Sequence, residues 1–537
     1  MIPAAPPPQA RRTNARARDT AAPPQAPRLP ASLFLFPTLA ATLLLCSTAR
    51  ATGFTDIGQD IRPREKIAFE LHGYLRGRSD ALYDLDLDRG LLPNGQPLYP
   101  VPLGEPKSQW LFGADMRLRT DLAVYAPGGG VAVKARLDTL DNVALGSKPD
   151  GVPYASLTQR PQGTLFSLRR AYGEAVLPFG VLALGRMGNH WGLGMFANGG
   201  DCLDCDGGDS VDRVAFLTPL FGHVFAFAWD FSATLAVRPR PDNRWISVAP
   251  FSGVRSVTIA ALKFRDDQAK ERRRKAGKST LEYGISLSHR WQDGDVPADY
   301  LPTPGTGPVA ITDAQVMGRG AKYFVADGYA TLVHPEFRVG AEVAVVAGQV
   351  DQPSLVPGAL LRDPIKSSQV GFAVESEIGT TESPFGLGLD GGFATGDTGA
   401  ILGATALPPP GGHLDAFKFA PDYRVDRILF REILGQVTGA FYVRPHARAR
   451  IFKFASGELR AEVAAIASFA SADKWTPSGD RGLGVEIDPG LVYKSRDGFF
   501  VALDHAVLVP LSGLDNTALG LKAQPAQLVR ARVAFLF

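Results

Sequence analysis

Cysteine is scarce in this chain, with three in 537 residues, and this scarcity excludes a small secreted domain held together by several disulfides. Long apolar runs are also missing. The longest, Leu33 to Leu45, is too short for a transmembrane helix, which needs roughly 20 residues. Enzyme motifs are missing as well, because the chain has no Gly-x-Ser-x-Gly elbow, no His-Glu-x-x-His and no phosphate-binding loop. We therefore expect neither a helical membrane protein nor an enzyme.

The first 51 residues have the features of an export leader that is later removed. The apolar run is followed by Ala49-Arg50-Ala51, a small-x-small pattern typical of a cleavage site, so we expect cleavage after Ala51. The leader holds six of the 57 basic residues and one of the 54 acidic residues. The rest of the chain then has 51 basic and 53 acidic residues, a net charge of −2. This balance gives no reason to expect nucleic acid as a partner.

From Lys66 to the C-terminus, apolar and polar residues alternate with a period of two. Successive side chains of a strand point to opposite faces, so this pattern predicts strands with one apolar and one charged face. Between Gly113 and Asp121, for example, small or apolar residues alternate with Asp115, Arg117 and Arg119. Similar stretches occur at 131–138, 281–288 and 529–537.

The connections between these stretches alternate between tight turns and long loops. Turn signals lie at 127–130, 178–180, 219–222, 334–336, 383–386, 445–447 and 496–498. Long polar connections lie at 79–108, 141–162, 189–211, 238–252, 292–318, 349–367, 395–431, 470–481 and 511–524. One basic connection, 266–278, takes the place of a turn. The count of strands is about 18, with 16 to 20 acceptable.

Short turns at one end and long loops at the other are typical of barrels that cross a membrane. The predicted fold is therefore all-β: a closed antiparallel transmembrane β-barrel over residues 65–537, with short periplasmic turns and long external loops. Residues 52–64 are expected to form a short periplasmic segment. The chain ends in an alternating strand with an aromatic last residue, Phe537. This ending resembles that of bacterial outer-membrane β-barrels, and the resemblance implies recognition of Phe537 by the barrel assembly machinery and residence among outer-membrane lipid.

If the apolar face contacts lipid, the charged face lines the lumen, because a charge toward lipid costs about 2–4 kcal/mol near the midplane. Parity then predicts a basic arc from the early strands and an acidic arc from the later ones, with a transverse field between them. The early set is Arg76, Arg78, Asp115, Arg117, Arg119, Lys134 and Arg136. The later set is Glu282, Glu342, Glu375, Glu377, Glu458, Arg460 and Glu462. Alternatively, these charges only solvate the wall or pair with one another.

The sharpest local feature is an acidic stretch that contains both cysteines of the exported chain. Because the envelope is oxidising, we predict a disulfide between Cys202 and Cys205. Zinc would need two more Cys or His ligands nearby, and the stretch has none. Ca²⁺ is a second hypothesis, since carboxylates supply the hard oxygen ligands that it prefers, and a solvated acidic loop is the alternative. The carboxylates in question are Asp201, Asp204, Asp206 and Asp209.

Three segments together resemble an uncharacterised family of myxobacterial-type outer-membrane barrels. They are the stretch from Cys202 to Asp209, Phe393-Ala-Thr-Gly-Asp397, and the stretch from Asp422 to Gly435. This resemblance covers most of the exported chain and implies no substrate. The pattern of a strand, Thr-Gly-Asp and a long loop is more distantly similar to alginate-export-type 18-stranded porins, and it implies no particular binding residue.

The first functional prediction is a passive channel for small polar or charged solutes. An 18-stranded barrel is wide enough for an aqueous passage unless loops plug it, and the charges of its lumen would set its selectivity. One alternative is a surface platform for binding or adhesion that presents loop 395–431. Another is a hydrolase embedded in the barrel.

Overall fold

The computed structural model describes residues 53–58, 61, 63–92, 95–102, 109–146, 165–233, 237–239, 242, 244–247, 252–296, 317–353, 363–379, 383–397 and 411–537. The leader and its predicted cleavage site lie outside these ranges. Within them, no helix has the length and apolar character that crossing a bilayer would require.

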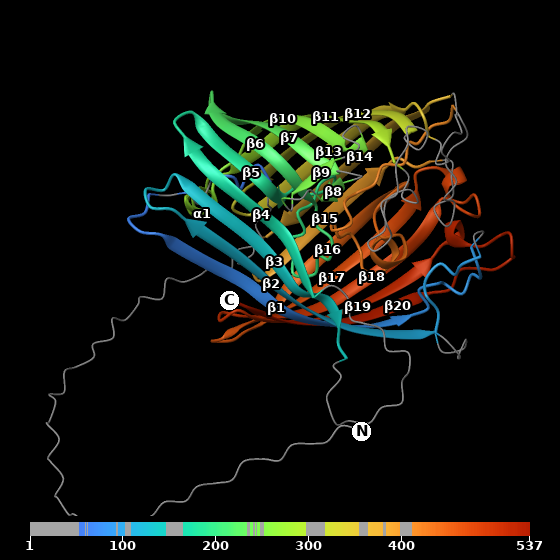
Figure 1. The fold of residues 1–537 in the computed structure, drawn as a ribbon. Coiled ribbons are helices and arrows are strands. Elements are labelled where there is room, and N and C mark those ends of the chain that lie inside the picture. The colour runs from blue at the N-terminus through green and yellow to red at the C-terminus, as the bar shows by residue number, and fades with distance from the viewer. Residues whose placement is uncertain are drawn as a thin grey trace, which may run out of the picture. The chain divides into compact units, whose positions relative to one another are not determined.

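The described residues form a closed antiparallel barrel of 18 strands, which confirms the predicted fold (Figure 1). The first half consists of β1 (Ala68–Tyr83), β2 (Trp110–Tyr125), β3 (Val131–Ala144), β4 (Phe166–Leu177), β5 (Gly180–Gly188), β6 (Ser210–Leu220), β7 (His223–Ala233), β10 (Val254–Lys263) and β11 (Thr280–Asp295). The second half consists of β12 (Met317–Val333), β13 (Phe337–Val350), β14 (Ile365–Ile378), β15 (Phe385–Ala394), β16 (Ala440–Lys453), β17 (Gly457–Ala470), β18 (Gly482–Ser495), β19 (Phe499–Pro510) and β20 (Ala526–Leu536). A separate hairpin pairs β8 (Val237–Pro239) with β9 (Trp245–Ser247).

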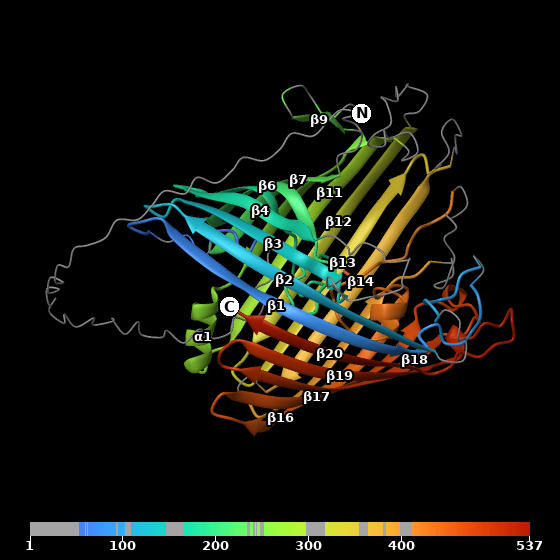
Figure 2. The same cartoon turned by 60° about the horizontal axis from the view of Figure 1, so that its bottom comes forward.

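Each barrel strand pairs with the next barrel strand along the chain, so β7 pairs with β10, and β1 pairs with β20 to close the ring (Figure 2). Because consecutive strands are antiparallel, successive connections alternate between the two ends of the barrel, and the tight turns all lie at one end. The basic connection at the short-turn end contains α1 (Asp267–Lys275), and the side chain of Asp266 caps this helix by accepting the N–H of Ala269 at 2.6 Å.

The turn predicted at 445–447 is wrong. These residues lie inside β16, and the turn to β17 is at 454–456. On one side of β16, Pro445 lies opposite Leu389 of β15. On the other side, the ladder between β16 and β17 has no bridge between Val443 and His446, so no partner there requires an N–H from Pro445. Proline has no N–H to donate, so it is confined to such gaps in a strand ladder.

The two faces of the barrel wall differ in the way that the period of two predicts. In β20, Val529 and Phe535 are exposed on the outer face, whereas Arg530 faces inward and is 3% exposed. Aromatic pairs lie on the outer face of the wall, near the long-loop ends of β2 and β7. Trp110 stacks with Phe112 at 6.0 Å between ring centroids, and Trp229 stacks with Phe231 at 5.4 Å. Such pairs are typical of the aromatic girdles of membrane barrels.

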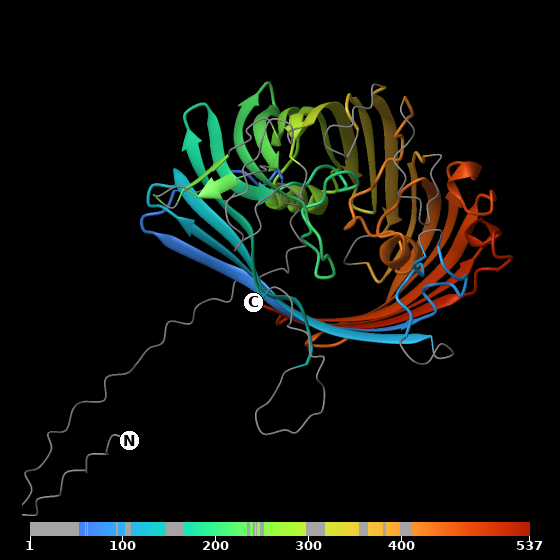
Figure 3. The same ribbon diagram turned by 45° about the vertical axis from the view of Figure 1, so that its right-hand side comes forward.

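The wall is not equally high around the ring. Strand β5 has nine residues, whereas β1 and β2 have 16 each and β12 has 17. At the low side, between β5 and β6, loop 3 (residues 189–209) turns inward (Figure 3).

Part of the N-terminal segment, residues 53–58, lies against the inner wall of the barrel. The periplasmic location expected for residues 52–64 stays a prediction. Phe54 and Ile57 are buried in a cluster with Met187 and with inward residues of β5, β6, β7 and β10. The ring of Phe54 meets Trp191 edge-on at 6.4 Å, and the guanidinium of Arg213 lies 4.6 Å from its centre. Burial of these two apolar side chains accounts for the inward course.

Candidate functional site

The inner wall of β1 to β4 is lined by arginines, as the parity of the strands predicts. Arg76, Arg78, Arg117 and Arg119 point inward, and none of them is more than 9% exposed. Their burial has a cause that the sequence did not show, because loop 3 lies on top of them. These arginines are therefore brought together, but they are covered and do not line an open pore.

The part of loop 3 that touches the arginines is residues 199–206, and we call residues 201–206 its acidic tip. Arg119 donates to the carbonyl of Gly200 at 2.8 Å, and Arg170 donates to that of Gly199 at 2.6 Å. A disulfide joins Cys202 to Cys205 with an S–S distance of 1.96 Å, at the position of the predicted bridge. The tip offers main-chain oxygens to the wall: Arg117 donates to the carbonyl of Cys205 at 2.6 Å, and Arg76 donates to that of Leu203 at 2.8 Å. Charged donors make these hydrogen bonds stronger than neutral ones.

The three tip carboxylates are each held by several arginines. Asp206 lies 2.6 Å from Arg78, 3.2 Å from Arg117 and 3.4 Å from Arg76. Asp201 pairs with Arg136 and, at 3.0 Å, with Arg170. The Asp204 carboxylate lies within 4 Å of four arginines, namely Arg431 at 2.5 Å, Arg78 at 3.3 Å, Arg532 at 3.4 Å and Arg530 at 3.7 Å.

This environment changes the proton affinity of the tip. Burial favours the neutral form of Asp204, but Arg431, Arg532 and Arg530 outweigh burial and hold the pKa of Asp204 well below its usual range. Burial likewise opposes ionisation of Asp206, and Arg78, Arg76 and Arg117 again lower its pKa. Both groups are therefore charged at neutral pH.

The Ca²⁺ hypothesis is not supported by this arrangement. The oxygens of Asp201, Asp204 and Asp206 face guanidinium groups, and Asp209 accepts the N–H of Asn198 at 3.3 Å. Across the described parts of the chain, no three His, Cys, Asp or Glu side chains are placed to share a metal ion. Coordination of Ca²⁺ needs about six to eight oxygens around one point.

On the far side of the lumen, a wall carboxylate holds the other end of loop 3. Glu342 of β13 accepts the N–H groups of Leu193 at 2.5 Å, Phe196 at 3.2 Å and Met195 at 3.3 Å. Glu342 is 1% exposed, so it is a loop anchor and not the free lumen charge expected from the sequence. Loop 3 therefore spans the barrel from the arginine wall to β13.

A second long loop folds into the lumen in the same way. Loop 7 joins β15 to β16, and its described part near β16, residues 411–439, contains the helical turn η4 (Leu429–Ile433). Glu486 of β18 accepts the N–H groups of Arg427 and Ile428 at 2.8 Å and that of Leu429 at 3.0 Å. Each of the two loops is thus held by a wall carboxylate that accepts several main-chain N–H groups.

Loops 3 and 7 also contact each other. The N–H of Ala420 donates to the carbonyl of Met195 at 2.7 Å, and Asp422 accepts the N–H of Asp206 at 3.2 Å. Around them, Phe417, Phe419 and Phe430 are buried in one apolar cluster with inward residues of β13 to β20. Figure 3 shows the described loops within the ring of strands. Their buried apolar side chains form a small hydrophobic core there.

A polar cavity of about 220 Å³ remains between loop 7 and the inner wall of β13 to β16. Its wall charges are paired: Arg338 lies 3.0 Å from Glu375, and Asp390 lies 2.6 Å from Arg444 and 3.2 Å from His446. Glu377 also lines this cavity and pairs with Arg448 at 2.5 Å. Glu375 and Glu377 are thus brought together as lumen residues.

The acidic arc predicted from the later strands is wrong as a continuous feature, because its members are dispersed and most are paired. Glu282 lies 3.3 Å from Lys270 of α1 at the turn end. Glu458 lies 2.5 Å from Arg460, whereas Glu462 is exposed near the same end. Among the early residues, Lys134 lies 3.2 Å from Glu174, and Asp115 lies 2.8 Å from Arg78. Local pairing therefore replaces the expected transverse field.

The terminal aromatic, Phe537, directly follows the last strand of the barrel. Its side chain is 54% exposed, and its main chain exchanges hydrogen bonds with Gly73 of β1 at 2.9 and 3.1 Å. The role of Phe537 in assembly stays a prediction.

Several residues of the site were missed at the level of sequence. They are Arg170, Asp390, Arg431, Arg444, His446, Glu486, Arg530 and Arg532. The strand members among them have inward parity, so the period of two offered a signal for these. No such signal exists for Arg431, because it lies in a loop.

Comparisons with known proteins find similar solved structures but no matching family or sequence. No protein-family model matches the chain, and no curated protein sequence does. Among solved structures, the chain is similar to the outer membrane channel DcaP of Acinetobacter baumannii, with 11% identity over 89% of this chain and 99% of that one and a TM-score of 0.41. It is also similar to OpdK of Pseudomonas aeruginosa, solved with vanillate, with 12% identity, 87% and 98% coverage and a TM-score of 0.43.

A third similar structure is OccK9 (OpdG) of Pseudomonas aeruginosa, with 12% identity, 87% and 98% coverage and a TM-score of 0.46. Identities and scores at this level carry no function to this chain. The resemblances to a myxobacterial-type family and to alginate-export-type porins are not shown by these comparisons.

Proposed function

We propose that the protein is an outer-membrane channel for small polar or charged solutes, with a passage that loops 3 and 7 narrow. The observation that carries the proposal is the contrast between the two faces of one closed wall. Exposed apolar side chains cover the outer face, whereas paired charges line the inner face of β1 to β4 and of β13 to β16. A bilayer accepts only such a wall, and water or polar solutes occupy only such an interior.

The loops decide how wide the passage is. Loop 3 is held at both ends, by the arginine wall and by Glu342, and loop 7 is held by Glu486. The cavity beneath loop 7 offers charges of both signs to a solute. We therefore propose a narrow channel and not a wide general pore.

The alternative of an adhesion platform is disfavoured by the course of loop 7. Its described part, which includes Phe417 and Phe430, is buried within the barrel and is not presented outward. Residues 398–410 lie outside the described residues. The proposal assigns the barrel no catalytic step.

Planar-bilayer recording of the purified protein tests the proposal. We expect a small unit conductance, and a larger one when residues 201–206 are replaced by a short Gly-Ser linker. A folded barrel that conducts neither with its own loop nor with the linker would overturn the proposal.

A further inference from the structure

The barrel wall has a notch above the ends of β5 and β6. Gly188, the last residue of β5, pairs with Ser210, the first of β6, and between them the chain turns inward as loop 3. The flanking strands continue higher. In the pairing of β4 with β5 the last bridge is Ala171 to Arg186, so residues 166–170 extend beyond it. In the pairing of β6 with β7 the last bridge is Asp212 to Phe231, and β7 continues for two residues beyond it.

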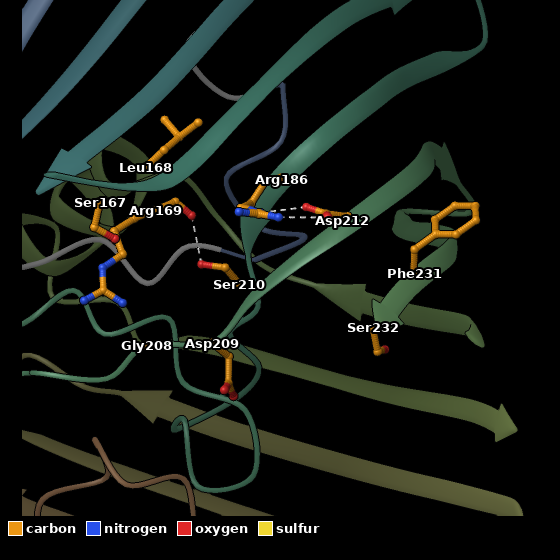
Figure 4. A pocket seen from close by; sticks show the side chains of 10 residues that line it. All are labelled: Ser167, Leu168, Arg169, Arg186, Gly208, Asp209, Ser210, Asp212, Phe231 and Ser232. Carbon is orange, nitrogen blue, oxygen red and sulfur yellow. Dashed lines mark hydrogen bonds and ion pairs between the residues drawn. The ribbon is translucent and has the colours of Figure 1, made fainter. Parts of the chain in front are cut away.

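A cavity of about 470 Å³ fills this notch (Figure 4). Its polar lining residues include Ser167, Ser210, Ser232 and Asp209. The Ser210 hydroxyl donates to the carbonyl of Arg169 at 3.0 Å, which ties the returning leg of loop 3 to the edge of β4. The flanks are apolar, since Leu168 is 43% and Phe231 is 37% exposed.

An ion pair forms the floor of the notch on the outer face of the wall. Arg186 donates to both oxygens of Asp212, at 2.8 and 3.0 Å, and each side chain is about half exposed. Arg186 shares its parity with Leu182 and Leu184, which are exposed on the outer face. The notch therefore opens sideways, toward the surroundings of the barrel.

The length of β5 gives the height of the notch. A strand needs about 9–11 residues to cross the hydrocarbon core, and β5 has nine. Its loop end thus lies at the outer boundary of the hydrocarbon, where a charged side chain costs only about 0–1 kcal/mol. The stacked pair of Trp229 and Phe231 is at the same level, as expected of an interfacial girdle.

We propose that the notch binds an amphiphile of the outer leaflet, with a hydroxyl-rich, uncharged head in the polar cavity and a tail along Leu168 and Phe231. Hydroxyl groups both donate and accept, so they suit serine hydroxyls and a bidentate Arg–Asp pair. A phosphate head would meet the carboxylates of Asp209 and Asp212. The guanidinium of Arg169 is turned to Asp138 and Asp141 of the inner wall, at 3.1 and 2.5 Å. This binding site is independent of whether the barrel conducts.

Native mass spectrometry of the full barrel tests the proposal, with dodecyl maltoside as the probe added to protein in an amine-oxide detergent. Maltose tests the head without a tail, and dodecyl phosphate tests the tail with an anionic head. We expect one dodecyl maltoside to be retained per barrel, at least tenfold more tightly than either of the others. Equal retention of maltose would show a soluble-sugar site, and equal retention of dodecyl phosphate would show binding through the tail alone, and either result overturns the proposal.

The matched variants remove one ion pair each. Arg186→Ala with Asp212→Ala deletes the floor of the notch without leaving a lone charge, and we expect retention to fall at least tenfold. The control, Glu271→Ala with Arg274→Ala, deletes another bidentate pair, with distances of 2.8 and 2.9 Å, in α1 at the opposite end of the barrel. It should retain the probe as the parent does. Both variants are first checked for folding by heat-dependent migration in gels. Unchanged retention in the folded notch variant would refute the site.

Discussion

Neutralising the acidic tip tests how loop 3 is held. In the variant Asp204→Asn with Asp206→Asn, the arginines around both carboxylates lose their compensating charge. Removing one partner of a buried ion pair costs about 3–5 kcal/mol. Because the two carboxylates share Arg78, their contributions do not add, and we take about 3–5 kcal/mol for the double change. At about 1.4 kcal/mol per factor of ten, the ratio of docked to released tip falls roughly 100- to 4,000-fold.

Release of the tip also changes the charge of the passage. Among the described residues, the ion pairs around the tip join eleven arginines to ten carboxylates, and three of these carboxylates belong to the tip. The arginines are Arg76, Arg78, Arg117, Arg119, Arg136, Arg169, Arg170, Arg427, Arg431, Arg530 and Arg532. The wall and loop 7 supply the other carboxylates, namely Asp80, Asp115, Asp121, Asp138, Asp141, Glu432 and Asp504. Without the tip, the arginines of this group therefore outnumber its carboxylates by four.

The assay is single-channel recording across a KCl gradient. We expect the double variant to conduct more and its reversal potential to shift toward that of chloride, because the uncovered wall is basic. Asp267→Asn with Glu271→Gln, which neutralises two carboxylates of α1 at the turn end, is the matched control and should behave as the parent. The reasoning fails if the double variant migrates as a folded barrel and yet keeps the conductance and reversal potential of the parent.

Three further outcomes are expected from the same arrangement. Replacing Cys202 and Cys205 by serine removes a cross-link worth about 2 kcal/mol for a four-residue loop, so the tip should be released more often and the single-channel conductance should rise. Two reactive thiols in the unreduced parent would contradict the bridge. Glu342→Ala leaves three main-chain N–H groups without their acceptor, at about 1–3 kcal/mol each, so proteolysis within 189–209 should be at least tenfold faster, and an unchanged cleavage rate would argue against the anchor. The pKa values of Asp204 and Asp206 are lowered in the docked tip, so their contribution to docking is complete above the ordinary value of 3.8 and is lost as the pH falls through the lower folded values. The difference in conductance between the parent and the double variant should therefore stay constant from pH 7 to pH 4. A difference that begins to shrink near pH 5 would contradict this.

Much of the wall could be predicted from the sequence because a strand has a strict period. The inward parity of Arg117 and Arg119 follows from two-residue alternation, and the barrel places both on the inner face. The turn predicted at Pro445 was wrong because a proline can also lie within a strand, at a position where the ladder requires no N–H donor. In β16 the pairing with β17 skips this position.

The contents of the lumen could not be predicted in the same way. Asp204 and Arg431 are 227 residues apart and meet because two loops enter one barrel. Periodicity tells which face a side chain takes, but it gives no distance between loops. The inward course of Phe54 and Ile57 was likewise hidden, since the short segment 53–58 is too brief to show a period.

The position of residues 53–58 constrains the order of assembly. Strands β1 and β20 meet along a seam that joins the two ends of the barrel sequence. Phe54 packs against inward residues of β5, β6, β7 and β10, so its seat is complete only when these strands have paired. The segment therefore docks after the strands that hold it. A bulky domain fused directly ahead of Gly53 would have to fit at the mouth of the barrel or pull the segment out of its seat.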